Sequence, residues 1–309
     1  MPARQSSEGD RSAPRPVDPQ ALDRIRRRLA AAPQPPWLHT EVARRMAERL
    51  AIVKLQPLQV LDWWAQGAAS RALLQTAYPR ARVVPVRPHG NAASAGTTPE
   101  AAPWWSPRRW SASATPAIDD EQVPAGAGQL LWANMMLHAV PDPAALFSAW
   151  HRALAIDGFV MFSTLGPGSL TGLRQLYRAQ GWPAPFAPFV DMHDLGDMLV
   201  QAGFADPVMD QEQLELSWPD AEALVQELRT LGGNADGARF AGLRTPRWRD
   251  QLVTALAALA GADGRPRLVF ELVYGHAFRP PPRPRMQAET AVAVEDLRAM
   301  ARRGAVARR

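Results

Sequence analysis

Cysteine is absent from this chain of 309 residues, which excludes disulfide bridges, thiolate zinc sites and cysteine nucleophiles. Long apolar runs are missing too, because the longest uncharged run, residues 122–141, is interrupted by Pro and Gly and contains Asn134 and His138. A membrane-spanning helix needs about 20 predominantly apolar residues. The N-terminal sequence MPARQSSEGDRSAPRP also lacks the apolar segment of a signal peptide. We therefore expect a cytoplasmic protein with no membrane partner.

Lysine is almost absent, since Lys54 is the only one and arginine supplies the other 34 of 35 basic side chains. The excess positive charge belongs to the two ends. Residues 1–30 carry seven Arg against four acids, and residues 279–309 carry eight Arg against three acids. The rest of the chain, with 20 basic and 23 acidic residues, offers no clustered positive face for a nucleic acid. The polar, Pro-rich ends, 1–17 and 279–309, are predicted to be mostly disordered.

Between residues 18 and 278, helical and strand-like segments alternate. Helices are predicted from Asp18 to Pro33, from Thr40 to Val53, and over 69–77, 144–154, 194–202, 219–231 and 247–259. Strands are predicted over 58–62, 82–86, 129–133, 158–163, 213–217 and 267–274, and the irregular segment 87–128 has room for one more. This order predicts one α/β domain, a doubly wound and mostly parallel sheet. The last two strands form an antiparallel edge, with a helical insert at about 218–262.

In such sheets, ligands bind beyond the carboxyl ends of the strands, where the strand order reverses. The first strand–turn–helix unit here is VLDWWAQGAAS, residues 60–70, with Gly67 as its only glycine. One glycine after a strand is commonly just a turn, and the alternative is a loop that presents a helix N-terminus to a nucleotide-like cofactor. The motifs of zinc hydrolases, serine hydrolases and phosphate-binding loops are absent, and we expect no metal site.

The chain resembles class I S-adenosylmethionine-dependent methyltransferases, in particular the biotin-synthesis branch that methylates the free carboxyl of malonyl carried on acyl carrier protein. The likeness lies in LLWANMMLHAVPDPAALFSAWHRALAIDGFVMFSTLGPGSLTGLR (130–174), FVDMHDLGDMLVQAGF (189–204), ELRTLGGNADGARFAGLRTPRW (227–248) and LVFELVYGHAF (268–278). It implies a Rossmann-like fold, S-adenosyl-L-methionine as cofactor, and a malonyl thioester of acyl carrier protein or coenzyme A as substrate. It implies nothing about the oligomeric state.

The resemblance also implies a cofactor site, at which this chain departs from the family pattern. Asp62 stands at the acidic position after the first strand, while Trp64, Gln66 and Ala68 fall near the expected glycines around Gly67. Arg87 stands roughly where an acid at the end of the second strand binds the ribose hydroxyls. Either the cofactor sits differently, stacked on Trp64, or the protein has lost it. The tryptophans at 104 and 105 are further candidates to cover the adenosine end.

Asn134 and His138, which follow the third predicted main strand, complete the expected cofactor site. Asn134 is placed to meet the amino-acid part of the cofactor, and the alternative is a turn residue. His138 is placed to line the pocket, and the alternative is a structurally hydrogen-bonded histidine.

Substrate contacts are expected from Arg174 and His193. A malonyl carboxylate is already ionised at pH 7, so the reaction needs alignment rather than a general base. The planar fork of an arginine suits two carboxylate oxygens. The alternatives are a surface role for Arg174 and, around His193, helix capping through Asp194. Arg239 and Arg244 flank a glycine-rich loop and are candidates to contact acidic acyl carrier protein, unless they are simply solvated.

Two other functions stay open. The altered 62–68 loop and Arg87 also suit a non-catalytic relative that keeps the fold to bind a partner. The N-terminal helices also suit kinship with the methyltransferase-like assembly factors of respiratory complex I, whose partner is a protein.

Overall fold

The computed structural model describes residues 15–64, 69–89 and 116–282. Its centre is a seven-stranded sheet in the order β3-β2-β1-β4-β5-β7-β6. The strands are β1 (Gln59–Trp63), β2 (Arg82–Arg87), β3 (Ile118–Asp119), β4 (Gly128–Ala133), β5 (Leu154–Leu165), β6 (Ala205–Ser217) and β7 (Arg267–Phe278). Strands β1 to β5 pair in parallel, and β7 is antiparallel to both β5 and β6. The predicted fold class, including the antiparallel edge, is confirmed, and the strand hidden in 87–128 is β3.

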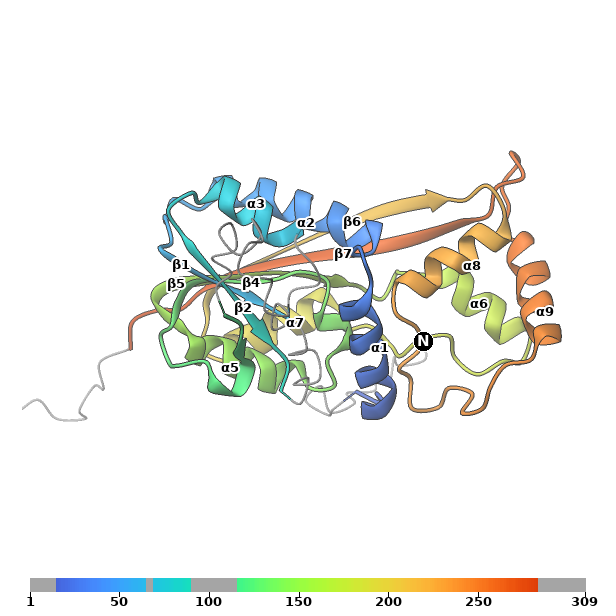
Figure 1. The fold of residues 1–309 in the computed structure, drawn as a ribbon, viewed down its shortest axis with the longest axis horizontal. Coiled ribbons are helices and arrows are strands. Elements are labelled where there is room, and N and C mark those ends of the chain that lie inside the picture. The colour runs from blue at the N-terminus through green and yellow to red at the C-terminus, as the bar shows by residue number, and fades with distance from the viewer. Residues whose placement is uncertain (1–14, 65–68, 90–115, 283–309) are drawn as a thin grey trace, which may run out of the picture.

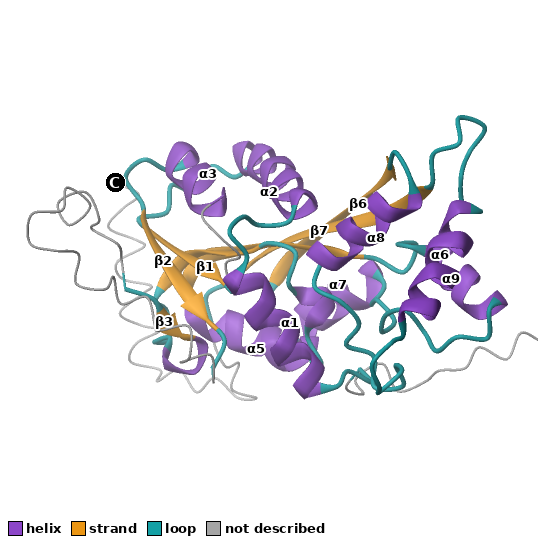
Figure 2. Cartoon of the chain, turned by 45° about the vertical axis from the view of Figure 1, so that its right-hand side comes forward, coloured by secondary structure: helices purple, strands orange, loops and turns teal. Residues whose placement is uncertain are grey.

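Helices cover both faces of the sheet, as Figures 1 and 2 show. They are α1 (Pro19–Ala31), α2 (Trp37–Arg49), α3 (Ala69–Ala77), α5 (Pro143–Ala153), α6 (Thr171–Ala179), α7 (Met192–Gln201), α8 (Ala221–Thr230) and α9 (Pro246–Ala257). Helices α2 and α3 lie on one face, and α5 and α7 lie on the other. Helices α6, α8 and α9 gather at the far end of the long β6–β7 ribbon, and α1 lies between this group and the sheet.

Local signals explain where the helices begin. Asp18 caps α1, since its carboxylate accepts hydrogen bonds from the backbone N–H groups of Gln20 and Ala21, and Pro19 fits the first helical turn. The prediction that the second helix begins at Thr40, with this residue as a possible cap, is wrong. Helix α2 begins at Trp37, directly after Pro36, and the Thr40 hydroxyl donates back to the Pro36 carbonyl.

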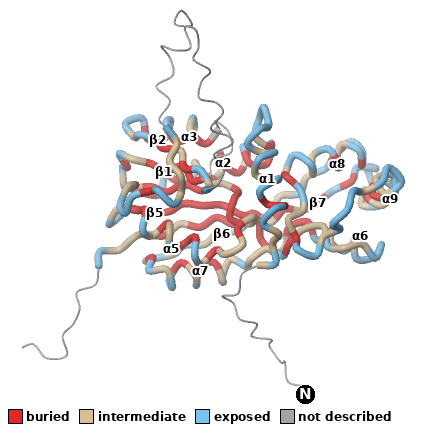
Figure 3. The backbone as a smooth tube through the Cα atoms, turned by 60° about the horizontal axis from the view of Figure 1, so that its bottom comes forward, coloured by how far each residue is buried: buried red, intermediate tan, exposed pale blue. Residues whose placement is uncertain are grey.

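The core has two layers, one on each side of the sheet. Figure 3 shows β5 and its neighbouring strands as the most deeply buried part of the chain. On the α5 side, the rings of Phe147, Trp150 and Phe162 pack against each other with centroids 5.3–5.9 Å apart. Trp63 of β1 meets Trp150 edge to face at 6.4 Å, so it belongs to the core. This packing fixes the strand ends that carry the site.

The N-terminal end of the described chain differs from the prediction of a disordered tail. Residues 15–17, expected in a disordered tail, are held in place. Val17 forms an antiparallel bridge with Asp236, and Arg15 donates to the carbonyls of His138 and Val140. The tail predictions for 1–14 and 283–309 lie outside the described residues. Within the described part, no helix has the length and apolar character to cross a membrane.

Candidate functional site

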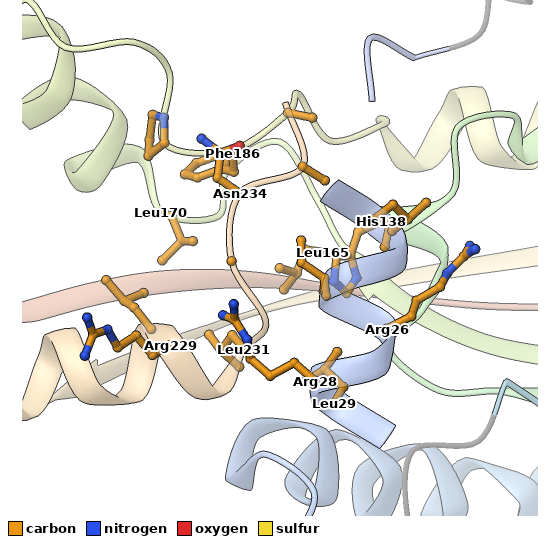
Figure 4. Close-up of a pocket in the computed structure, with 18 of the residues that line it drawn as sticks. Arg26, Arg28, Leu29, His138, Leu165, Leu170, Phe186, Arg229, Leu231 and Asn234 are labelled. Atoms are coloured by element: carbon orange, nitrogen blue, oxygen red, sulfur yellow. The ribbon is translucent and has the colours of Figure 1, made fainter. Parts of the chain in front are cut away.

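A cavity of about 690 Å³ opens at the carboxyl ends of the parallel strands. Trp64 follows β1, Val86 and Arg87 end β2, Met135 and His138 follow β4, and all five line the cavity. This is the point where the strand order reverses, since β1 lies between β2 and β4. From there the cavity runs beneath α1 to the helices of the insert (Figure 4). The position predicted from the sequence for a ligand site is therefore hollow.

Trp64 adopts a backbone conformation that favours glycine. Its φ is +53°, in the left-handed region, where a side chain costs about 1–2 kcal/mol. A glycine would fit this position without strain, which gives a physical reason for the glycine that the family pattern has near here. The backbone N–H of Trp64 donates to the Val86 carbonyl at 2.8 Å, so the turn is tied to the end of β2.

The indole of Trp64 is held at the edge of the cavity. Its Nε1–H donates to an Asp120 carboxylate oxygen at 2.9 Å. The Arg26 guanidinium of α1 lies 4.2 Å from the centre of the indole ring. Burial lowers the pKa of Arg26, while the charges of Asp23 and Asp120 raise it. The arginine and the carboxylate thus fix the ring in place, and the cavity persists beside it.

The remaining predicted residues of the first crossover lie in different places. Asp62 is buried beneath the cavity and does not line it, and burial raises its pKa to about 7, against the opposing charge of Arg71. Arg87 is exposed and lines the cavity at the end of β2. Gly67, Gln66 and Ala68 lie outside the described residues, as do Trp104 and Trp105.

Asn134 serves the scaffold. Its amide nitrogen donates to the His39 carbonyl at 2.9 Å, and its amide oxygen accepts from the Ser163 hydroxyl at 2.9 Å. It joins the end of β4 to α2 and β5 and is not among the side chains that line the cavity. The alternative reading, a turn residue at the strand end, describes this placement better.

His138 lines the cavity and carries a buried Nδ1 that finds no hydrogen-bond partner among the described residues. Burial, followed by the nearby His39 and Arg15, lowers the pKa of His138 to about 3. A neutral imidazole therefore faces the cavity at pH 7. An unpaired buried nitrogen is costly, and a ligand group that donates or accepts a hydrogen bond would satisfy it.

The two predicted substrate residues lie off the cavity. Arg174 stacks on Phe186, with its guanidinium carbon 4.9 Å from the ring centre. His193 is exposed, and its ring and backbone nitrogens both lie 2.8 Å from the Asp191 carboxylate. Asp191, not Asp194, caps α7. Their expected contacts with the substrate stay predictions, and neither side chain is among those that line the cavity.

Arginines supply the charge of the cavity wall, and four of them, Arg26, Arg28, Arg229 and Arg249, were not expected from the sequence. Six arginines line the whole cavity, and no Asp or Glu does so within the described residues. They are Arg26, Arg28, Arg87, Arg229, Arg244 and Arg249. Arg244 stacks on Phe240 and Trp248, and Arg249 pairs with Glu222. Arg239, the other candidate for a carrier contact, pairs with Asp18 at 2.5 Å instead.

A doubly wound sheet with an antiparallel edge and a cavity at its switch point defines the class of α/β proteins that bind a ligand where the strand order reverses. Among solved structures, the YcgJ protein from Bacillus subtilis matches 77% of this chain and 99% of its own, with a TM-score of 0.51 and 9% identity. That likeness concerns the fold alone. No family model matches the chain.

Sequence comparison gives the family. The malonyl-[acyl-carrier protein] O-methyltransferase of Laribacter hongkongensis is 36% identical over 257 residues, which are 82% of this chain and 86% of the relative. The enzyme of the same name from Gallionella capsiferriformans is 36% identical over 250 residues, 80% of this chain and 85% of the relative. The chain belongs to the malonyl-[acyl-carrier protein] O-methyltransferase family, as the resemblance in its sequence indicated.

Proposed function

We propose that this protein is an S-adenosyl-L-methionine-dependent O-methyltransferase that methylates the free carboxylate of a malonyl thioester in biotin precursor synthesis. The observation that carries the proposal is the cavity at the carboxyl ends of β1, β2 and β4 in a chain that belongs to this family. Family membership alone leaves open whether the altered cofactor loop still admits a ligand. The cavity beside Trp64 supports a site that does.

The residues present fit the methyl donor in volume and in lining. Ligand pockets of about 300–1,000 Å³ are usual, and 690 Å³ lies well within this range. Trp64, Val86, Met135 and His138 would hold the donor, and the unpaired Nδ1 of His138 offers it a hydrogen-bonding group. Arg87 is the position that does not match, because it brings a cation where ribose hydroxyls favour a carboxylate.

When bound, the donor supplies an electrophilic methyl group on a sulfonium. The protein's own task is to bring a malonyl carboxylate into line with that methyl and to keep water away. The cavity wall is suited to the second task, since Met135, Leu165 and Leu170 are all buried apolar residues. The carboxylate is ionised at neutral pH, so no side chain has to remove a proton. The neutral His138 is consistent with this chemistry, because its role would be contact rather than proton transfer.

Acyl carrier protein is the carrier named for the relatives, and we extend it to this chain as the partner. The exposed arginines of α1 and the insert are suited to an acidic carrier. Coenzyme A as an alternative carrier stays a prediction, and so does a cytoplasmic location.

A non-catalytic role is the second candidate. It is favoured by two residues, the strained Trp64 at a position suited to glycine and Arg87 at the end of β2. In that case the fold would serve only to bind a partner, and the cavity would bind no methyl donor.

The test is a direct assay with the full chain, malonyl-acyl carrier protein and methyl-labelled S-adenosylmethionine. We expect label in a methyl ester of the malonyl group, detected by mass spectrometry, and growth of a biotin-requiring strain that lacks its own enzyme. Acetyl-acyl carrier protein, which has no free carboxylate, is the matched control and should stay unlabelled. Absence of both label and growth, with a folded protein, would favour the non-catalytic alternative.

A further inference from the structure

The arginines that line the cavity differ in what already neutralises or covers them. Arg26 stacks on Trp64, Arg244 stacks on two rings, and Arg249 is paired with Glu222. Within the described part of the chain, Arg28 and Arg229 have neither a carboxylate nor a ring as a partner, although both line the cavity. Arg87 shares this property but lies at the opposite end, beside β2.

Arg28 and Arg229 come from different elements, and both line the insert end of the cavity. Figure 4 shows Arg28 reaching from α1 and Arg229 from the end of α8, with Leu231 between them. The Arg28 Nη1–H donates to the Gly232 carbonyl at 3.0 Å, which anchors the guanidinium beside the end of α8. A guanidinium has five N–H donors, so most of those on Arg28 remain for a ligand.

The surrounding backbone keeps this geometry in place. Asp18 N–H donates to the Ala235 carbonyl and Gly237 N–H donates to the Pro16 carbonyl, both at 2.8 Å. Val17 and Asp236 form a bridge between the same two segments. The segment before α1 and the loop after α8 are therefore joined as a roof, which holds α1, with Arg28, beside the end of α8, with Arg229.

We propose that Arg28 and Arg229 make the insert end of the cavity an anion site for a negatively charged group of the thioester substrate. The proposal rests on the proposed function and adds to it the residues that recognise the substrate. Two positive charges without a carboxylate partner, at a cavity wall that lacks Asp and Glu within the described residues, favour an anionic ligand. Two groups of a carrier thioester have this chemistry, the malonyl carboxylate and the phosphate of a phosphopantetheine arm. A guanidinium binds either group through paired hydrogen bonds.

The experiment uses the full chain and three small thioesters. Malonyl-pantetheine carries only the carboxylate, acetyl-phosphopantetheine carries only the phosphate, and acetyl-pantetheine carries neither. Their dissociation constants are measured by calorimetry for the wild type, Arg28→Gln, Arg229→Gln and Arg28→Lys. The matched controls are Arg24→Gln and Arg27→Gln, exposed arginines of the same helix that do not line the cavity. Thermal unfolding establishes that each variant is folded, and the affinity for S-adenosylhomocysteine is recorded in parallel.

We expect Arg28→Gln and Arg229→Gln each to weaken one anionic probe by about 10- to 100-fold, as the loss of a charged hydrogen bond predicts. Acetyl-pantetheine and S-adenosylhomocysteine should bind as before, and Arg28→Lys should recover part of the loss. Weaker binding of malonyl-pantetheine identifies the carboxylate as the group that the arginines bind. Weaker binding of acetyl-phosphopantetheine identifies the phosphate. If the variants bind both anionic probes as well as Arg24→Gln and Arg27→Gln do, the anion site is wrong while the proposed function stands. A wild type that binds no thioester and no S-adenosylhomocysteine overturns both.

Discussion

The indole N–H of Trp64 donates to the carboxylate of Asp120 at 2.9 Å, which joins the residue after β1 to the residue after the short β3. This bond fixes the ring at the edge of the cavity that Trp64 lines. The same carboxylate accepts the backbone N–H of His89 at 2.9 Å, so it links three segments of the chain. A tryptophan at the glycine position thus coexists with an open ligand site.

Replacing Trp64 tests the backbone strain at this turn. Glycine usually destabilises a protein relative to alanine, but here φ is +53° and alanine would remain strained. We expect Trp64→Gly to be more stable than Trp64→Ala by about 1 kcal/mol, measured by urea unfolding. Both should be less stable than the wild type, because both lose the indole hydrogen bond and the Arg26 contact. The reverse order of the two variants would contradict the strained conformation.

Asp62 should make stability fall as the pH rises. Burial raises its pKa in the folded chain to about 7, whereas an unfolded Asp titrates near 4. The folded state therefore holds an extra proton between about pH 4 and pH 7, and the free energy of unfolding decreases through that window. Asp62→Asn lacks this titration, so the wild type should lose up to about 4 kcal/mol relative to it. A difference between the two proteins that is independent of pH would contradict the burial of this carboxyl.

His138 should have the opposite effect on stability, because its burial makes the protein less stable in acid. Its pKa is lowered to about 3, first by burial, so the unfolded chain takes up the proton before the folded chain does. The free energy of unfolding should decrease as the pH falls from about 6.5 toward 3. His138→Gln keeps a neutral polar side chain and should lack this component. Parallel denaturation curves of the two proteins at pH 7 and pH 5 measure it, and an equal loss in both would speak against a buried neutral histidine.

Gly232 tests the roof of the cavity. Its φ is +111°, and a Cβ there would lie 2.6 Å from Cγ2 of Ile25, a β-branched residue of α1 with little freedom to move. Gly264 is the matched control, since its φ of +74° is also positive but a Cβ would meet nothing within 4 Å. We expect Gly264→Ala to lower the free energy of unfolding by about 1 kcal/mol and Gly232→Ala to lower it by about 2–4 kcal/mol, measured by chemical unfolding. Adding Ile25→Ala should recover part of the second loss, and equal costs for both glycines would refute the close contact.

The sequence predicts the scaffold better than it predicts the site. Strand and helix patterns are local, and the positions of β1, β2 and α3 follow from them closely. Strand β6 is longer than predicted because its first half, from Ala205, alternates between exposed and half-buried residues at the sheet edge, where an apolar pattern is weak.

The site depends on which way side chains turn after the elements pack. Arg26, Arg27 and Arg28 are consecutive in one helix, and the sequence does not distinguish one from another. In the folded chain, Arg26 stacks on Trp64, and of the two exposed residues Arg27 and Arg28 only Arg28 lines the cavity. Arg174 was singled out instead because it follows a strand end, and its stacking on Phe186 depends on the path of residues 180–190. No local pattern distinguishes these arginines, since their partners are more than 10 residues away in sequence or belong to other elements.

The central claim is that the cavity beside Trp64 binds a methyl donor, and calorimetric titration of the full chain with S-adenosylhomocysteine tests it most directly. We predict saturable binding with one site per chain, weakened by His138→Ala and retained by Arg27→Gln. No heat of binding at millimolar ligand, from a protein with an intact unfolding transition, would contradict it.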